Sequence, residues 1–154
     1  GSSCEMEMVQ LRGVTSTVRD TNAELGADAK LVLTEKLLTH GNQTAISNMK
    51  VDLKGEGSSV QVISRSVAQD DSVQVFNPLV IGECACRGHV QCDAIIMDSG
   101  TVGARPEITA NSVEASLIHE AAIGKIAGEQ LNKLMTLGLT EKEAEEQIIS
   151  GFLK

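Results

Sequence analysis

A short unit, small turn residues followed by an apolar strand, recurs along the middle of the chain and constrains its fold more than any other feature. The clearest copies span residues 57–62, 70–75, 100–104 and 111–115. Equivalent positions in successive units are Leu31, Val60, Val73, Val102 and Val113, and the intervals between them are 29, 13, 29 and 11 residues. Such self-similarity predicts coils that stack on one another. The spacing is too irregular for a hexapeptide left-handed β-helix, so it favours a looser right-handed solenoid or a double-layered β structure.

The aromatic content supports stacked coils. The chain has no Trp or Tyr, and Phe76 and Phe152 are its only aromatic residues. Sandwich and bundle cores use aromatic rings as filler, whereas a solenoid needs ladders of medium-sized aliphatic side chains. An aromatic-poor sandwich is the alternative. For the solenoid we predict one continuous aliphatic core, formed by Leu31, Val60, Val62, Val73, Val75, Val102 and Val113.

After residue 122 the pattern changes from strand to helix. Leu131, Leu134 and Met135 have helical spacing and predict a helix over about 127–137, with Gly138 as its left-handed stop. Thr140 and Glu143 have the spacing of a capping box, which predicts a second helix over 140–150 that Gly151 ends. The residues expected to face inward are Ala144, Ile148 and Phe152, and those expected to face water are Glu141, Glu145 and Glu146.

Composition excludes several classes of protein. The 154 residues predict a single globular domain, and a net charge of −8 without a basic stripe argues against nucleic-acid and membrane partners. No apolar run has the length of a membrane span, and the first residues lack a signal-peptide pattern, so we expect a cytoplasmic protein. The sequence contains no phosphate loop, GxSxG elbow or HExxH motif, and we predict that it is not an enzyme.

Three of the four cysteines lie in one short segment. Cys84 and Cys86 share a face if the segment is a strand, and His89 and Cys92 follow closely, a donor set suited to zinc or an iron–sulfur centre. The spacing is not that of a zinc ribbon, and cysteine is also a common buried small residue. Burial and metal binding both remain open on these residues.

The C-terminal third carries a family resemblance. The matching residues are His119-Glu120-Ala121, Lys125-Ile126, Glu129-Gln130-Leu131, Leu134-Met135, the run 138–144 and Gly151-Phe152. In this order they resemble the C-terminal signature of the SufB and SufD iron–sulfur assembly scaffold proteins, and the resemblance extends over roughly residues 20–154. It implies a right-handed parallel β-helix, residues 1–122 here, followed by a helical subdomain, residues 123–154. It further implies pairing with a sister subunit or a second copy, and docking of the ABC-type ATPase SufC on the C-terminal helices.

The resemblance also implies site residues. His119 and Glu120 match a His-Glu pair that contributes to a cluster-forming site at the subunit interface, so we predict both as ligands of a transient iron–sulfur cluster. Gln91-Cys92-Asp93 matches a further family segment, but the thiol ligand of SufB-type proteins corresponds to Thr101 or Val102, where no cysteine is present.

We therefore predict a cluster-assembly scaffold subunit that is metal-free when isolated. Two alternatives remain: a structural solenoid that couples an ATPase without holding a cluster, and a separate metal-binding protein that uses Cys84, Cys86, His89 and Cys92.

Overall fold

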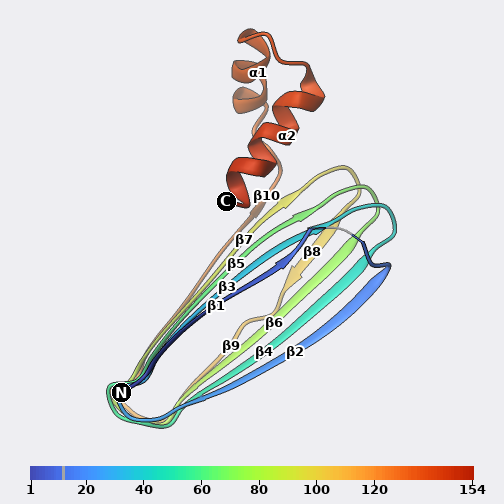
Figure 1. Cartoon of the computed structure of the whole chain (residues 1–154). Helices are drawn as coiled ribbons and strands as arrows, with labels where there is room; N and C mark the ends of the chain where they lie inside the picture. Colours follow the sequence, from blue (N-terminus) through green and yellow to red (C-terminus); the bar gives the residue numbers. More distant parts are fainter. Residues whose placement is uncertain (12) are drawn as a thin grey trace.

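The chain winds into a solenoid of two parallel sheets, with a pair of helices at one end (Figure 1). The computed structural model describes residues 1–11 and 13–154. The first sheet contains β1 (Ser3–Gln10), β3 (Lys30–Thr39), β5 (Ser59–Ala68), β7 (Arg87–Ile96) and β10 (Ser116–Gly124), in that order. The second contains β2 (Ser16–Leu25), β4 (Thr44–Leu53), β6 (Val73–Gly82) and β8 (Thr101–Ala104), and β9 (Glu107–Ala110) also pairs with β6. The predicted parallel β-solenoid with two C-terminal helices is confirmed.

Each strand pairs with the strand one coil away. Leu31 pairs with Val60, Val60 with Gly88, and Gly88 with Leu117. These steps are 29, 28 and 29 residues. The 29-residue interval from Leu31 to Val60 in the sequence is therefore the length of one coil. A chain that repeats every coil buries its aliphatic side chains between the two sheets in continuous ladders.

The core lies between the sheets and is aliphatic at its centre. Its fully buried members include Leu33, Val51, Leu53, Val62, Val80 and Val90. Of the seven residues predicted to form it, Leu31, Val60 and Val62 are buried. The prediction is wrong for Val73, which is 37% exposed, and for Val113, which is fully exposed in the turn before β10. Val75 and Val102 are only half-buried.

The error at Val73 is one of strand phase. In β6 the side chains that point inward are Gln74, Phe76, Pro78 and Val80, so the valines between them face outward. Gln74 is accommodated inside because its Nε2 donates to Thr39 Oγ1 and to the Val67 carbonyl, each at 2.8 Å. A one-residue shift in phase reverses every side chain of a strand.

A second polar group lies within the solenoid. Glu35 of β3 is 2% exposed and pairs with Arg19 of β2 across the interior. Burial raises the pKa of the Glu35 carboxyl, while the adjacent Ser47 and Ser64 hydroxyls and the Arg19 guanidinium oppose this increase. The solenoid therefore contains an internal ion pair beside two buried serines.

Stacked turns define the corners of the coils. Asp28, Asp70 and Asp98 have positive φ values of 56°, 55° and 53°, and each lies in a turn. The Asp70 carboxylate accepts a hydrogen bond from Gly41 N at 2.6 Å, and the Asp98 carboxylate accepts one from Asp70 N at 3.2 Å. Asp28 lies at the opposite corner, where Gly55 of the next coil is so close that an added Cβ would be 2.0 Å from Ala27 N. The corners hold successive coils in register.

The tail consists of α1 (Gly128–Thr136) and α2 (Glu141–Phe152). Gly138 has a φ of 97°, and Thr140 and Glu143 form both hydrogen bonds of the predicted capping box. Gly151 does not end α2, which continues to Phe152. None of the residues of α1 is buried.

The tail contacts the solenoid through α2. Ile149 packs against Leu38 and Val67, and Phe152 and Leu153 border the same cluster. Ala144 is fully buried as predicted, but Ile149 is more buried than Ile148, which is half-buried like Phe152. Glu141 and Glu146 are exposed as predicted, whereas Glu145 is half-buried. No helix in residues 1–11 and 13–154 is long and apolar enough to cross a membrane.

Candidate functional site

The candidate site is on β10, the last strand of the first sheet. β10 pairs with β7 on one side, and no described strand pairs with its other side. Its side chains alternate, so that Leu117 and His119 are half-buried while Ile118 and Glu120 are exposed. The two residues of the predicted His-Glu pair therefore point to opposite faces of the strand.

His119 faces the interior of the last coil. Its Nε2 atom is buried and has no hydrogen-bond partner among the described residues. Burial is the main cause that lowers the pKa of His119, and the positive charge of a protonated His89 would lower it further, whereas the Glu120 carboxylate raises it. The net lowering favours a neutral imidazole, the form that has a free lone pair for a metal ion or a hydrogen bond.

Glu120 lies on the outer face and contacts a histidine from the neighbouring strand. Its Oε1 is 3.2 Å from His89 Nε2, and the side chains of His89 and Glu120 are 35% and 63% exposed. His89 pairs in register with Ile118, so Glu120 is two residues further along the same face. The pleat places these two side chains together although 31 residues separate them in the sequence.

The cysteine-rich segment is not brought together into a four-ligand site. Cys84 and Cys86 lie in the turn before β7, where Cys86 is buried and Cys84 Sγ approaches the Leu53 carbonyl at 3.7 Å. Cys92 points into the core, and His89 points outward from the same strand. Within residues 1–11 and 13–154, no group of three or more His, Cys, Asp and Glu side chains could hold a metal ion.

The pKa values of the Cys84 and Cys92 thiols are raised. Burial raises the pKa of Cys92 to about 11, with smaller contributions from the negative charges of Asp93 and Glu35. Burial likewise raises the pKa of Cys84, and the neighbouring Cys86 thiol adds to the effect. Since the thiolate is the nucleophile and the metal ligand, this environment disfavours both roles at neutral pH.

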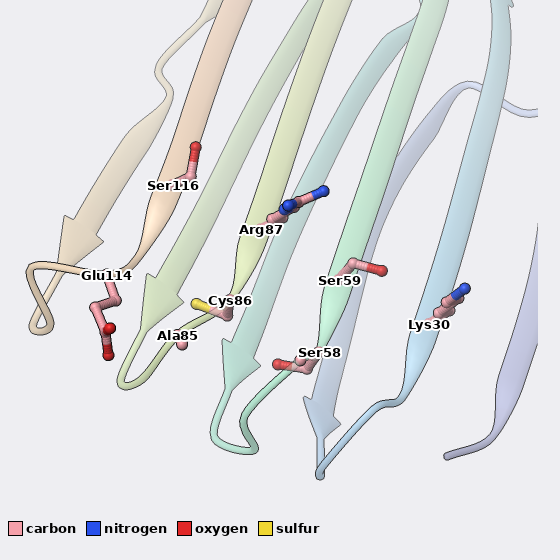
Figure 2. A pocket seen from close by; sticks show the side chains of 9 residues that line it. Lys30, Ser58, Ser59, Ala85, Cys86, Arg87, Glu114 and Ser116 are labelled. Atoms are coloured by element: carbon pink, nitrogen blue, oxygen red, sulfur yellow. The ribbon is translucent and has the colours of Figure 1, made fainter.

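An open groove of about 950 Å³ lies where β3, β5, β7 and β10 begin (Figure 2). Lys30, Ser59 and Arg87 point outward along it, and Ser116 and Glu114 border its far end. Ser116 is four residues before Glu120 on β10, roughly 13 Å away along the strand. The groove therefore does not reach Glu120, although Arg87, which lines it, is two residues before His89 on the same face of β7.

The sequence identified the strand of the candidate site but not the geometry of its ligands. Adjacent residues on a strand cannot share a face, so His119 and Glu120 do not form a chelating pair in this conformation. The contact between His89 and Glu120 depends on the coil length, and the 29-residue spacing from Leu31 to Val60 was the only signal of it in the sequence.

The fold and the site define a parallel β-solenoid protein whose last coil carries candidate ligands on a free strand edge. The family model of the SufBD core domain, from the SUF system of FeS cluster assembly, matches residues 1–152. The chain belongs to the SufBD family.

Curated relatives agree. The chain is 36% identical over 117 residues to an iron–sulfur cluster assembly SufBD family protein of Methanothermobacter thermautotrophicus, a match that covers 73% of this chain and 28% of the relative. It is 30% identical over 128 residues to one of Archaeoglobus fulgidus, covering 82% and 35%. It is 36% identical over 107 residues to one of Pyrococcus horikoshii, covering 68% and 24%. The chain thus spans between about a quarter and about a third of the length of these relatives.

Proposed function

We propose that this chain acts as a scaffold subunit in Suf-type iron–sulfur cluster assembly, with the cluster as its transient cargo. Family membership supports the process, and the free edge of β10, which carries Glu120, supports the place where the cargo would form. The role is that of a binding platform in the cytoplasm rather than of an enzyme.

The chain would hold the cluster together with a second subunit. The unpaired edge of β10 offers backbone N–H and C=O groups to another chain, and such edges are templates for pairing. Ile118 and Ile123 on this strand and Ile108 on β9 are 53%, 40% and 40% exposed. Exposed isoleucines on β9 and β10 of the last coil, together with an open strand edge, favour a sister SufB/SufD-type subunit or a second copy of this chain as the partner.

The helical tail would bind the ATPase. Leu134 and Met135 lie on α1, a helix without any buried residue, and Leu137 at its C-cap is 76% exposed. Acidic side chains line α2 beside them. An unburied apolar stripe with an acidic surround suits a partner with an apolar groove and a basic rim, here a SufC-like ATPase.

Anaerobic reconstitution of the complex with iron and sulfide tests the scaffold role. We expect visible absorbance together with iron and sulfide bound to the complex, and loss of both with His119→Ala while circular dichroism stays unchanged. Cys84→Ser and Cys86→Ser should retain the cluster. A wild-type complex that binds no cluster contradicts the scaffold role, and leaves the structural solenoid that couples an ATPase.

A truncation tests the ATPase contact. A chain cut at Leu139 should lose affinity for the ATPase in a pull-down, and Leu137→Asp in the full chain should weaken it without changing the thermal stability. Undiminished capture by both variants contradicts a contact through the tail. Stoichiometric zinc or iron bound through Cys84, Cys86 and Cys92 in the isolated chain would instead favour the separate metal-binding protein.

A further inference from the structure

His89 and Glu120 have the donor atoms and the separation of two ligands on one metal ion. Zinc-type bonds to imidazole nitrogen and carboxylate oxygen are about 2.0–2.2 Å long, so two such ligands on a tetrahedral or octahedral ion lie roughly 3.0–3.4 Å apart. The Nε2–Oε1 distance of 3.2 Å lies within this interval. Both side chains are partly exposed, so an ion can enter without any movement of the core.

The surroundings of the pair suit a cation. Asp93 lies on the same face of β7 and accepts a hydrogen bond from Gln91 at 2.7 Å, and Gln91 is the register partner of Glu120. Gln61 is the register partner of His89 on the other side. Arg87, two residues before His89 on that face, is the nearest like charge along the strand. Imidazole and carboxylate donors together suit iron, cobalt and zinc as divalent ions.

The chain supplies only half of such a site. No third His, Cys, Asp or Glu joins the pair among residues 1–11 and 13–154. Glu120, however, is on the strand with the free edge, so a chain paired along β10 would bring its own side chains beside this carboxylate. The missing donors can therefore come from the partner subunit.

We propose that His89 and Glu120 form a half-site for Fe²⁺ at the outer face of β7 and β10, completed by ligands of the subunit that pairs with β10. This inference rests on the proposed scaffold function and deepens it, because it assigns a metal ligand outside the His119–Glu120 motif. It gives the chain a nitrogen donor on the outer face of β7. His119 lies on the opposite face and is not part of the half-site.

Binding of Co²⁺ to the full isolated chain tests the half-site directly, with Co²⁺ as a visible probe for Fe²⁺. We expect one weakly held ion per chain, and His89→Ala or Glu120→Gln should reduce the affinity at least about tenfold, the loss typical of even an outer-shell change. The chain has three histidines, and His40, which lies in the turn between β3 and β4, provides the matched control: His40→Ala should bind Co²⁺ as the wild type does. Equal affinity in His89→Ala and wild type overturns the proposal, as does wild-type protein that binds no Co²⁺.

His89→Cys separates a ligand from a merely structural residue. A thiolate at position 89 should restore binding and add a sulfur-to-cobalt charge-transfer band that the wild type lacks, because only a direct ligand contributes such a band. Binding without that band contradicts direct ligation by residue 89. Circular dichroism of each variant establishes that the fold is retained.

Reconstitution of the complex distinguishes this inference from the scaffold function. If wild type assembles a cluster and His89→Ala assembles it equally well, the half-site is wrong and the scaffold role stands. If no variant assembles a cluster, the scaffold role fails, and the Co²⁺ titration still decides whether His89 is a ligand. We expect wild type to assemble the cluster and His89→Ala to lose most of it.

Discussion

The solenoid and its helical tail are stabilised in different ways. Every inner strand of the solenoid pairs on both sides, and its core residues Leu53, Val62 and Val67 have no exposed surface. The tail touches the solenoid through one small cluster around Ile149, and α1 buries no residue. The solenoid therefore has the burial of a self-sufficient fold, whereas two short helices with so little burial depend on docking for their structure. The difference places the self-sufficient core in the solenoid, whereas the tail leaves most of its apolar surface without contacts in this chain.

Val62→Asp should have the largest effect on stability, because it places a charge in the buried core of the solenoid. Val62 is 0% exposed, and an unpaired carboxylate there costs several kcal/mol, comparable to the whole stability of a domain. We expect an unfolded or aggregated chain by circular dichroism. Val73→Asp is the matched control on the outer face of β6 and should remain folded. A soluble, folded Val62→Asp protein would show that the solenoid core tolerates charge.

Ile149→Ala should detach the tail and spare the solenoid. Removal of a buried isoleucine side chain costs about 2–4 kcal/mol, and here the loss falls on the contact between α2 and the strands. We expect faster amide hydrogen exchange throughout α1 and α2 with unchanged protection in β3, β5 and β7. Uniformly faster exchange across the chain would mean that tail and solenoid unfold together.

Thr140→Ala should weaken α2 alone. The substitution removes the hydroxyl that accepts from Glu143 N, a capping contact that typically contributes about 1 kcal/mol. Helix content should fall slightly while the main thermal transition stays in place. Thr140→Ser retains the hydroxyl and should behave as wild type. A shift of the main transition equal to that of a core mutation would contradict a separately stabilised tail.

Glu35→Gln should produce the smallest effect, a change in how stability depends on pH. The pKa of this carboxyl is raised above its ordinary 4.5 in the folded state, so the folded chain binds this proton more tightly than the unfolded chain. Its contribution is therefore most favourable below pH 4.5 and declines as the pH rises through the raised value. Urea unfolding from pH 4 to 8 should show the variant gaining stability relative to wild type over that window. A constant difference would mean that Arg19 fully compensates the buried charge.

Local patterns in the sequence predicted local structure well. Gly138 and the Thr140–Glu143 box determine helix ends through contacts within a few residues, and both were found where the sequence placed them. The recurrence of turn and strand likewise predicted the solenoid. Gly151 was misread because an isolated glycine in a final helical turn can be accommodated without ending the helix.

Properties that depend on distant coils were harder to predict. In β6, Gln74 faces inward because Thr39 and Val67 on other strands accept its hydrogen bonds, and an inward glutamine misled the prediction of which face is buried. His119 and Glu120 were grouped because they are adjacent, yet pleating separates them. His89 and Glu120 meet only because the coil repeats about every 29 residues, which a reader of the sequence can use once the coil length is known.

Each coil pairs only with the coils directly before and after it, and this affects how the chain folds as it leaves the ribosome. A coil of about 29 residues takes roughly 1–6 s to emerge at ordinary synthesis rates, which is slow compared with strand pairing. Each finished coil can then act as the template on which the next one is laid, with the aspartate and glycine corners fixing where it starts. β10 is the surface left when this growth stops. The edge proposed to bind a partner subunit is thus of the same kind as the edge on which each earlier coil was added. Assembly of two subunits would then use the same strand pairing that adds coils during folding.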